Sequence, residues 1–159
     1  MSRLESFRRR LTAQIDGLNW AMDAVRDVPG DVLDLGLGNG RTYDHLRAYS
    51  GKRVWVVDRV LQCHPSSVPP AEDFLQGDAD VMMQRLVDQD VRLALIHSDL
   101  GTGDKASSAQ LHLDLSPLIA ALLAPGGVAV SQEPLAGLTR VRGPDSVPEA
   151  RDNFYRACA

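Results

Sequence analysis

The chain has 159 residues, of which 44% are hydrophobic and 24% charged, a composition typical of one soluble globular domain. The formal net charge of -4 does not favour nucleic-acid binding, which usually requires a basic face. No apolar stretch reaches the ~20 residues of a membrane span, and the charged N-terminus lacks the apolar region of a signal peptide. Cys63 and Cys158 form no metal-binding or disulfide pattern, which favours free thiols and a cytoplasmic location.

Residues 1–28 predict an amphipathic helical segment. Apolar side chains recur every three or four positions from Leu4 to Val25, as on one face of a helix. Gly17 lies inside this pattern and predicts either two helices or one bent helix, and Pro29-Gly30 ends it. We expect most of this segment to pack on a sheet. Phe7 and Trp20 are possible pocket walls, although aromatic residues at helical spacing more often belong to the core. We expect residues 1–159 to form a single domain.

Residues 32–41, VLDLGLGNGR, combine a short buried strand, three alternating glycines and the first residue of a helix expected over 41–48. This arrangement brings backbone N–H groups and a helix N-terminus against a ligand. The spacing G-x-G-x-G differs from the G-x-G-x-x-G of dinucleotide-binding proteins. Asp34, just before the first glycine, would repel a pyrophosphate and attract an ammonium group. A ligand with a cationic amino group and a nucleoside, such as S-adenosylmethionine, therefore fits the turn better than a dinucleotide.

The sequence DLGLGNG resembles motif I of the class I S-adenosylmethionine-dependent methyltransferases, whose pattern is [DE]-x-G-x-G-x-G. The resemblance implies an α/β fold with a Rossmann-like, doubly wound, mostly parallel sheet. It also implies that Asp34 holds the methionine amino group of S-adenosylmethionine while the glycine backbone approaches the cofactor. The implied cofactor-binding residues in this segment are Asp34, Gly36, Leu37, Gly38, Asn39, Gly40 and Thr42.

A second strand, expected over 52–57, is followed directly by Asp58. A carboxylate at the end of strand two can accept hydrogen bonds from both ribose hydroxyls of a nucleotide. We therefore expect Asp58 and its neighbour Arg59 to line the nucleoside end of the site. The next segment, 59–70, contains three prolines and is expected to lack regular structure.

A short third strand over 73–77 precedes a helix expected to begin at residues 77–79 and to reach Leu86. Asp78 could cap this helix through its side chain. An acidic residue after strand three also resembles the methyltransferase position that binds the adenine amino group. The resemblance therefore implies that Gly77, Asp78 and Ala79 contact the adenine, and capping is compatible with that contact.

The fourth strand is expected over 91–97 and is followed by the loop SDLGTGD. In open parallel sheets, ligands bind outside the carboxyl ends of the strands, near the point where strand order reverses. If strands one and four are neighbours, this loop faces the methyl group, with Ser98 and Asp99 touching the cofactor. Asp99 is then the candidate general base, with His97 as the alternative. The Asn/Asp-Pro-Pro-aromatic motif of nucleic-acid amino methyltransferases is absent.

The last third of the chain predicts a helix over 106–123, kinked or divided at Pro117, and a fifth strand over 128–131. Pro125-Gly126-Gly127 resembles the turn before strand five of class I methyltransferases. A short C-terminal strand pair is expected over 138–141 and 153–158. There is hardly room for the usual helix between strands five and six, so we expect a thinly covered sheet face that a second copy of the chain could cover.

Taken together, these segments resemble a small bacterial single-domain group, the S-adenosyl-L-methionine methyltransferases of type 17, whose substrate is not defined. The predicted function is methyl transfer from S-adenosylmethionine to a small-molecule acceptor, with no nucleic-acid, membrane or metal partner. One alternative is a non-catalytic protein that binds S-adenosylmethionine. The other is an NAD(P)-dependent oxidoreductase, which the glycine spacing, Asp34 and the lack of a Tyr-x-x-x-Lys pair disfavour.

Overall fold

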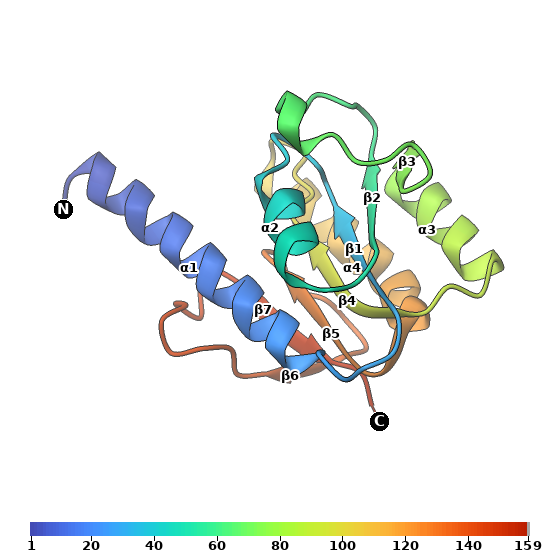
Figure 1. Cartoon of the computed structure of the whole chain (residues 1–159). Coiled ribbons are helices and arrows are strands. Elements are labelled where there is room, and N and C mark those ends of the chain that lie inside the picture. The colour runs from blue at the N-terminus through green and yellow to red at the C-terminus, as the bar shows by residue number, and fades with distance from the viewer. Residues whose placement is uncertain (159) are drawn as a thin grey trace.

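The computed structural model describes residues 1–158 and contains a seven-stranded sheet with helices on both faces (Figure 1). The strands are β1 (Asp31–Leu35), β2 (Val54–Asp58), β3 (Phe74–Gln76), β4 (Leu93–Ser98), β5 (Leu123–Ser131), β6 (Thr139–Val141) and β7 (Asn153–Arg156). The helices are α1 (Arg3–Ala24), α2 (Arg41–Tyr49), α3 (Ala79–Asp88) and α4 (Lys105–Leu122), with a 3-10 turn, η1 (Pro65–Ser67), in the segment expected to be irregular.

The sheet has the strand order β3-β2-β1-β4-β5-β7-β6, and only β7 runs against its neighbours. The order reverses between β1 and β4, which pair in parallel. The carboxyl ends of β1 to β5 therefore meet at one edge of the sheet. Because β7 is antiparallel, its first residue, Asn153, lies at the same edge, paired with Ser131 at the end of β5. The predicted doubly wound, mostly parallel sheet with a C-terminal strand pair is confirmed.

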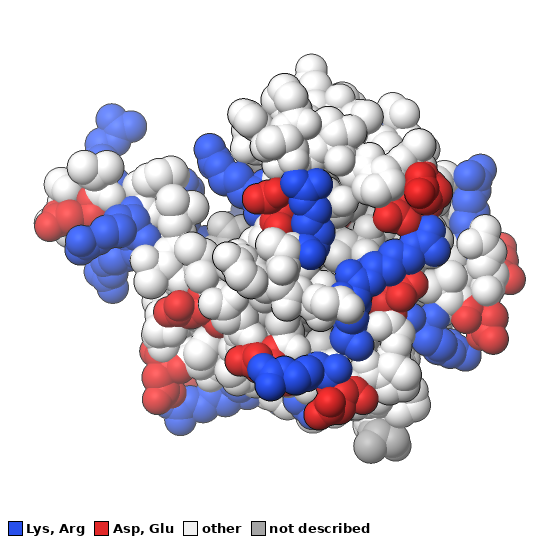
Figure 2. All heavy atoms as spheres, viewed as in Figure 1, with Lys and Arg blue, Asp and Glu red and all other residues white. Residues whose placement is uncertain are grey.

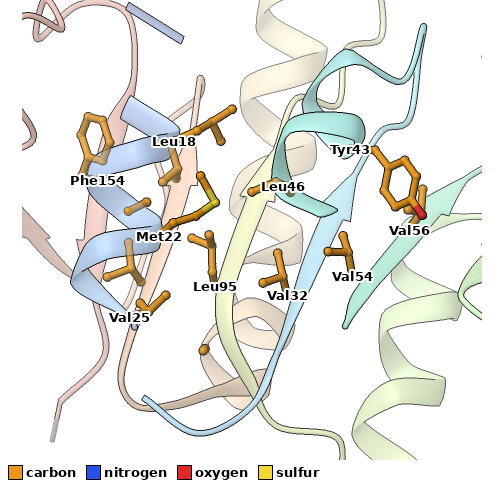
Figure 3. Packing of buried hydrophobic residues seen from close by; sticks show 14 of the residues in the cluster. Leu18, Met22, Val25, Val32, Tyr43, Leu46, Val54, Val56, Leu95 and Phe154 are labelled. Carbon is orange, nitrogen blue, oxygen red and sulfur yellow. The ribbon is translucent and has the colours of Figure 1, made fainter. Parts of the chain in front are cut away.

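The core has two layers because successive residues of each strand point to opposite faces of the sheet. On one face, Leu18 of α1 and Leu46 of α2 pack with Val32 of β1 (Figure 3). On the other face, Leu33 packs with Ile119 and the rest of the apolar sides of α3 and α4. The apolar runs of the central strands thus account for the predicted parallel, doubly covered sheet.

Helix α1 is continuous, and Gly17 is needed for packing. A Cβ built on Gly17 would lie 3.3 Å from the ring of Phe154 in β7. The same ring meets Trp20 edge-on, with 5.1 Å between the ring centroids. Gly17 is therefore the position where the helix approaches strand β7 most closely, and it neither divides nor ends the helix.

The N-terminal half of α1 does not pack on the sheet, contrary to expectation. Leu4 is 76% exposed and Ile15 is 46% exposed, whereas Leu18 and Met22 are buried. Figure 1 shows this half of the helix projecting beyond the body of the protein. Figure 2 shows blue Lys and Arg side chains gathered at that projecting end. The helical periodicity continues along α1, but the sheet beneath it ends earlier.

Two other local features differ in detail from the prediction. Helix α4 runs through Pro117 and is not divided there. Strand β5 begins at Leu123, and the Pro-Gly-Gly residues form a bulge within it, between the pairs Leu93–Leu123 and Leu95–Val128. The bulge needs a glycine, because a Cβ on Gly127 would lie 2.9 Å from the carbonyl oxygen of Ala124.

The expected bare sheet face is also not observed. Phe154 and Tyr155, which point to opposite faces of β7, are each 4% exposed. α1 covers the first, and the link over 132–138 covers the second, since Leu135 N–H donates to the Tyr155 hydroxyl at 3.0 Å. Ala136 N–H donates to Ser116 Oγ of α4 at 2.9 Å and fixes the same link. The link takes the place of a helix, so this face gives no reason to expect a second copy.

Candidate functional site

A cleft of about 1010 Å³ opens at the carboxyl edge of the sheet. That volume lies at the upper end of the ~300–1,000 Å³ typical of small-molecule sites. Of the residues predicted from the sequence, those that line the cleft are Gly36, Leu37, Gly38, Asn39, Gly40, Thr42, Asp58, Arg59, Gly77, Asp78, Ala79 and Asp99. Asp34, His97 and Ser98 do not line it, and each is at most 4% exposed.

The three glycines after β1 have positive φ angles but serve different purposes. A Cβ on Gly36 would lie 3.1 Å from the backbone oxygen of Asp99, and one on Gly40 would lie 2.6 Å from Ser67 Cβ. These two glycines allow other parts of the chain to approach. A Cβ on Gly38 would meet nothing within 4 Å. Gly38 is thus the glycine whose missing side chain leaves open space in the cleft.

Asp58, at the end of β2, holds the glycine turn in place. Its Oδ2 accepts hydrogen bonds from the backbone N–H groups of Leu37 at 2.7 Å and Gly38 at 3.3 Å. Its Oδ1 accepts from Val60 N–H at 3.1 Å. Each carboxylate oxygen can accept more than one hydrogen bond. Asp58 therefore links β1 to β2 and still has acceptor capacity toward the cleft.

Arg59 and Asp78 form an ion pair across the ends of β2 and β3, with 2.6 Å between Arg59 Nε and Asp78 Oδ1. Asp78 occupies the N-cap position of α3 with an extended backbone, but its side chain makes no capping bond. The predicted side-chain cap is therefore wrong, because the carboxylate turns toward Arg59. Both side chains are more than half exposed, so the pair contributes little to stability and can rearrange around a ligand.

Asp34 and His97 form a buried pair beneath the cleft. They are register partners in β1 and β4, and His97 Nδ1 lies 3.0 Å from Asp34 Oδ1. Asp34 Oδ2 is buried and has no hydrogen-bond partner among the described residues. Burial raises the pKa of Asp34, and the bond to His97 offsets part of that effect. Burial alone would lower the pKa of His97, but the bond to Asp34 and nearby carboxylates outweigh it, so the pKa of His97 is raised.

Ser98 belongs to a buried polar network that shapes the loop after β4. Its hydroxyl lies 2.8 Å from His112 Nε2, and His112 Nδ1 donates to the backbone oxygen of Ser108 at 2.8 Å. The Ser108 hydroxyl accepts from Thr102 N–H at 3.0 Å. The network ties the end of β4 and residue 102 to α4. Ser98 and His112 therefore position the loop that carries Asp99 without reaching the cleft themselves.

α1 supplies one wall of the cleft, of which only Phe7 was considered as a possible pocket wall from the sequence. Phe7, Arg10, Leu11 and Gln14 line it, with the spacing of a single helical face. Gln14 Nε2 donates to Thr42 Oγ1 at 2.9 Å and fixes the wall to α2. The arginine of this face lies over the Phe7 ring, 5.1 Å from its centroid. The signal was present in the helical periodicity, but it is identical to the signal for core packing.

Arg151 and Gln132 also line the cleft, beside β7 and β5, and were not predicted from the sequence. Gln132 follows β5 directly, and Arg151 lies two residues before β7. The antiparallel direction of β7 is what brings Arg151 to the carboxyl edge of the sheet. Asp152 beside it is buried, and burial raises the pKa of its carboxyl despite the nearby charges of Arg151 and His97.

A profile of the family described as S-adenosyl-L-methionine methyltransferase matches residues 1–157 of the chain. Among solved structures, an S-adenosyl-L-methionine methyltransferase from Silicibacter pomeroyi DSS-3 is 33% identical, covers 98% of each chain and superposes with a TM-score of 0.90. No match was found among curated proteins.

More distant structures share the fold. An RNA methyltransferase from Salinibacter ruber, in complex with S-adenosyl-L-homocysteine, is 20% identical, with a TM-score of 0.56 and coverage of 90% of this chain and 88% of that one. A TDP-rhamnose 3'-O-methyltransferase of calicheamicin biosynthesis is 16% identical, with a TM-score of 0.57 and coverage of 97% and 80%. These two act on chemically unrelated acceptors, so the fold does not identify the acceptor of this chain.

Proposed function

The chain belongs to the S-adenosyl-L-methionine methyltransferase family, and from this premise we propose that it methylates a small-molecule acceptor. Its cofactor is S-adenosylmethionine. The observation that carries the proposal is the cleft at the carboxyl edge of the sheet, which is enclosed by α1 and has open space at Gly38. We propose that the cofactor lies over the β1–β2–β3 half of this edge and the acceptor over the β4–β5–β7 half.

The residues of the first half fit a nucleoside with an amino-acid tail. Asp58 has acceptor capacity for ribose hydroxyls, and Asp78 lies at the end of β3, where an adenine amino group could donate to it. The space over Gly38 lets a ligand approach the backbone of the turn. Asp34 is closed off from the cleft, so we propose that it favours the cationic amino group as a buried negative charge and not by direct contact.

When bound, S-adenosylmethionine supplies a methyl group on a sulfonium. An acceptor lone pair forms the new bond to the methyl carbon, and the electrons of the broken S–C bond stay on sulfur. The chain's own contribution is mainly to position the two reactants and exclude water. Asp99 lies on the cleft, and its carboxylate can take the proton that an acceptor N–H or O–H group must lose. His97 is buried, so we propose that it positions Asp34 and does not act as the base.

The direct test is transfer of a tritiated methyl group from S-adenosylmethionine to components of a cell extract separated by size. We expect label in a low-mass product that chromatography separates from S-adenosylmethionine itself. Asp99→Asn should lower that transfer at least tenfold while leaving S-adenosylhomocysteine affinity within twofold. Asp114→Asn, which alters an exposed acid of α4 outside the cleft, is the control and should behave as the unaltered protein. Label confined to RNA or protein would contradict the proposal.

The alternatives make different predictions. The oxidoreductase hypothesis is set aside because the cofactor of the family is S-adenosylmethionine. A non-catalytic binding protein would take up S-adenosylhomocysteine but transfer no label to any fraction. Within residues 1–158, no helix combines the length and apolar character needed to cross a membrane.

A further inference from the structure

We propose that the acceptor carries an anionic group, a carboxylate or a phosphate, and that Arg151 binds it. This inference rests on the proposed function, because it assigns Arg151 to the acceptor half of the cleft. Arg151 lies at the carboxyl edge of the sheet, next to β7 and across β5 from the Asp99 loop. It is therefore on the opposite side of β4 from the glycine turn and Asp58.

The guanidinium of Arg151 lines the cleft, and not all of its N–H groups have a hydrogen-bond acceptor. Its side chain is only 22% exposed, and its Nε is buried with no hydrogen bond among the described residues. The nearest acid is Asp152, whose Oδ2 lies 3.7 Å from Nε, beyond hydrogen-bond distance. A buried donor of a charged group without an acceptor is costly. The exposed part of the guanidinium lines the cleft, where a carboxylate or a phosphate can accept hydrogen bonds from its N–H groups.

The distribution of charges in the cleft assigns this anion to the acceptor. Arg59 is already paired with Asp78 at the adenine end. S-adenosylmethionine has one carboxylate, on its methionine part. Arg41 follows the glycine turn directly, and Arg10 lies on the α1 wall that Gln14 joins to Thr42, so both arginines line the side of the cleft that we assign to the cofactor. Arg151 is thus available for a second anion, beyond the methyl group.

The cleft that Arg151 lines favours a small anion. Leu100 and Leu111 line the same cleft and are partly exposed, so part of its wall is apolar. A recessed guanidinium admits a carboxylate or phosphate at the end of a small molecule more readily than the continuous backbone of a nucleic acid. The chain's net charge of -4 points the same way, since RNA binding relies on an extended basic surface.

The test compares anionic and neutral probes of one shape. Protein saturated with S-adenosylhomocysteine is titrated with benzoate, phenyl phosphate and benzamide, and binding is followed by calorimetry. We expect one or both anions to bind at least tenfold more tightly than benzamide. Arg151→Gln should reduce that preference to less than twofold, and Arg151→Lys should retain part of it. The matched control is Arg142→Gln, which alters an exposed arginine of the same segment and should keep the preference.

Several outcomes would overturn the proposal. They are equal binding of benzamide and the anions, no binding of any probe to the loaded protein, or an anion preference that survives Arg151→Gln. A tenfold loss of S-adenosylhomocysteine affinity in Arg151→Gln would also overturn it, by assigning the guanidinium to the cofactor carboxylate. Failure of the unaltered, folded protein to bind S-adenosylhomocysteine would be a separate result, which contradicts the proposed function itself.

Discussion

At the scale of single residues, Asp58 has two roles that can be separated experimentally. It fixes the backbone of the glycine turn through Leu37 and Gly38, and it offers acceptor capacity to a ribose. Hydrogen bonds to a charged group contribute about 1.5–3 kcal/mol each. We therefore expect Asp58→Ala to lower S-adenosylhomocysteine affinity at least tenfold in calorimetric titration.

The control for Asp58 must leave the turn intact. Asp114→Ala alters an exposed acid of α4 that lies outside the cleft, and it should change the affinity less than twofold. Asp58→Asn keeps one acceptor oxygen, so its affinity should fall between those of Asp58→Ala and the unaltered protein. An affinity that Asp58→Ala leaves unchanged would refute the assigned role of this carboxylate.

The buried pair of Asp34 and His97 makes the free energy of unfolding depend on pH. Both pKa values are higher in the folded protein than in the unfolded chain, so the folded state binds more protons where these groups titrate. The contribution of His97 is fully present below its unfolded pKa of about 6.5 and is lost as pH rises through the folded pKa. We expect the free energy of unfolding, measured by urea denaturation, to fall as pH rises above about 6.5.

Removal of His97 alone and removal of both His97 and Asp34 should have different effects on the free energy of unfolding. His97→Ala leaves the Asp34 carboxylate buried without a partner, which typically costs about 3–5 kcal/mol. The double variant Asp34→Asn/His97→Asn replaces the pair with two neutral amides, so it should be more stable than His97→Ala and should lose most of the pH dependence. The same pH dependence in the double variant would show that other groups cause it.

At the scale of elements, the glycine turn and η1 are packed against each other. A Cβ on Gly40 would lie 2.6 Å from Ser67 Cβ of η1, whereas one on Gly38 would face open space. Both positions have positive φ, which alone costs a residue with a side chain about 1–2 kcal/mol. Gly40→Ala adds a steric clash to this strain, so we expect it to lower the free energy of unfolding more than Gly38→Ala in urea denaturation.

For S-adenosylhomocysteine affinity, the order of the two variants should be reversed, with Gly38→Ala having the larger effect. Gly38→Ala places a methyl group in the open space of the cleft and should lower S-adenosylhomocysteine affinity at least tenfold. Gly40→Ala, assayed where it is folded, should lower it less, because its methyl group points toward η1. Equal affinities in the two variants would contradict the assignment of Gly38 as the glycine that faces the ligand.

The strands and the glycine turn could be predicted from the sequence because their signals are local. Short apolar runs followed by Asp58 or by alternating glycines predict a buried strand and its functional end without reference to the rest of the chain. The α1 wall could not be predicted in this way. The spacing of Phe7 and Leu11 is the same whether the helical face meets a sheet or a cleft, and only the extent of the sheet decides between them.

Arg151 shows a second limit of sequence interpretation. Its place in the cleft depends on the antiparallel direction of β7, which is a property of the whole sheet. The predicted terminal strand pair gave no order of pairing with β5, so the segment before β7 could not be assigned to the carboxyl edge. Asp34 and His97 were found as residue types at strand ends, but their burial follows from the pairing of β1 with β4.

At the scale of the whole molecule, charge argues against nucleic acid as the acceptor. The net charge is -4, and on the face seen in Figure 2 the Lys and Arg side chains of the body alternate with Asp and Glu and form no extended basic surface. Salt-sensitive binding to RNA needs many phosphate contacts. We therefore expect no retardation of a transfer RNA in gels at about 50 mM salt. Binding that weakens steeply as salt is raised would contradict this prediction and favour an RNA acceptor.

The central claim is that the cleft at the carboxyl edge of this sheet binds S-adenosylmethionine and its product. The most direct measurement is a calorimetric titration of the folded protein with S-adenosylhomocysteine, with NADH titrated into the same preparation. We expect saturable binding of S-adenosylhomocysteine at one site per chain and no binding of NADH. Binding of NADH alone, or of neither compound by a protein whose folding is verified by circular dichroism, would contradict it.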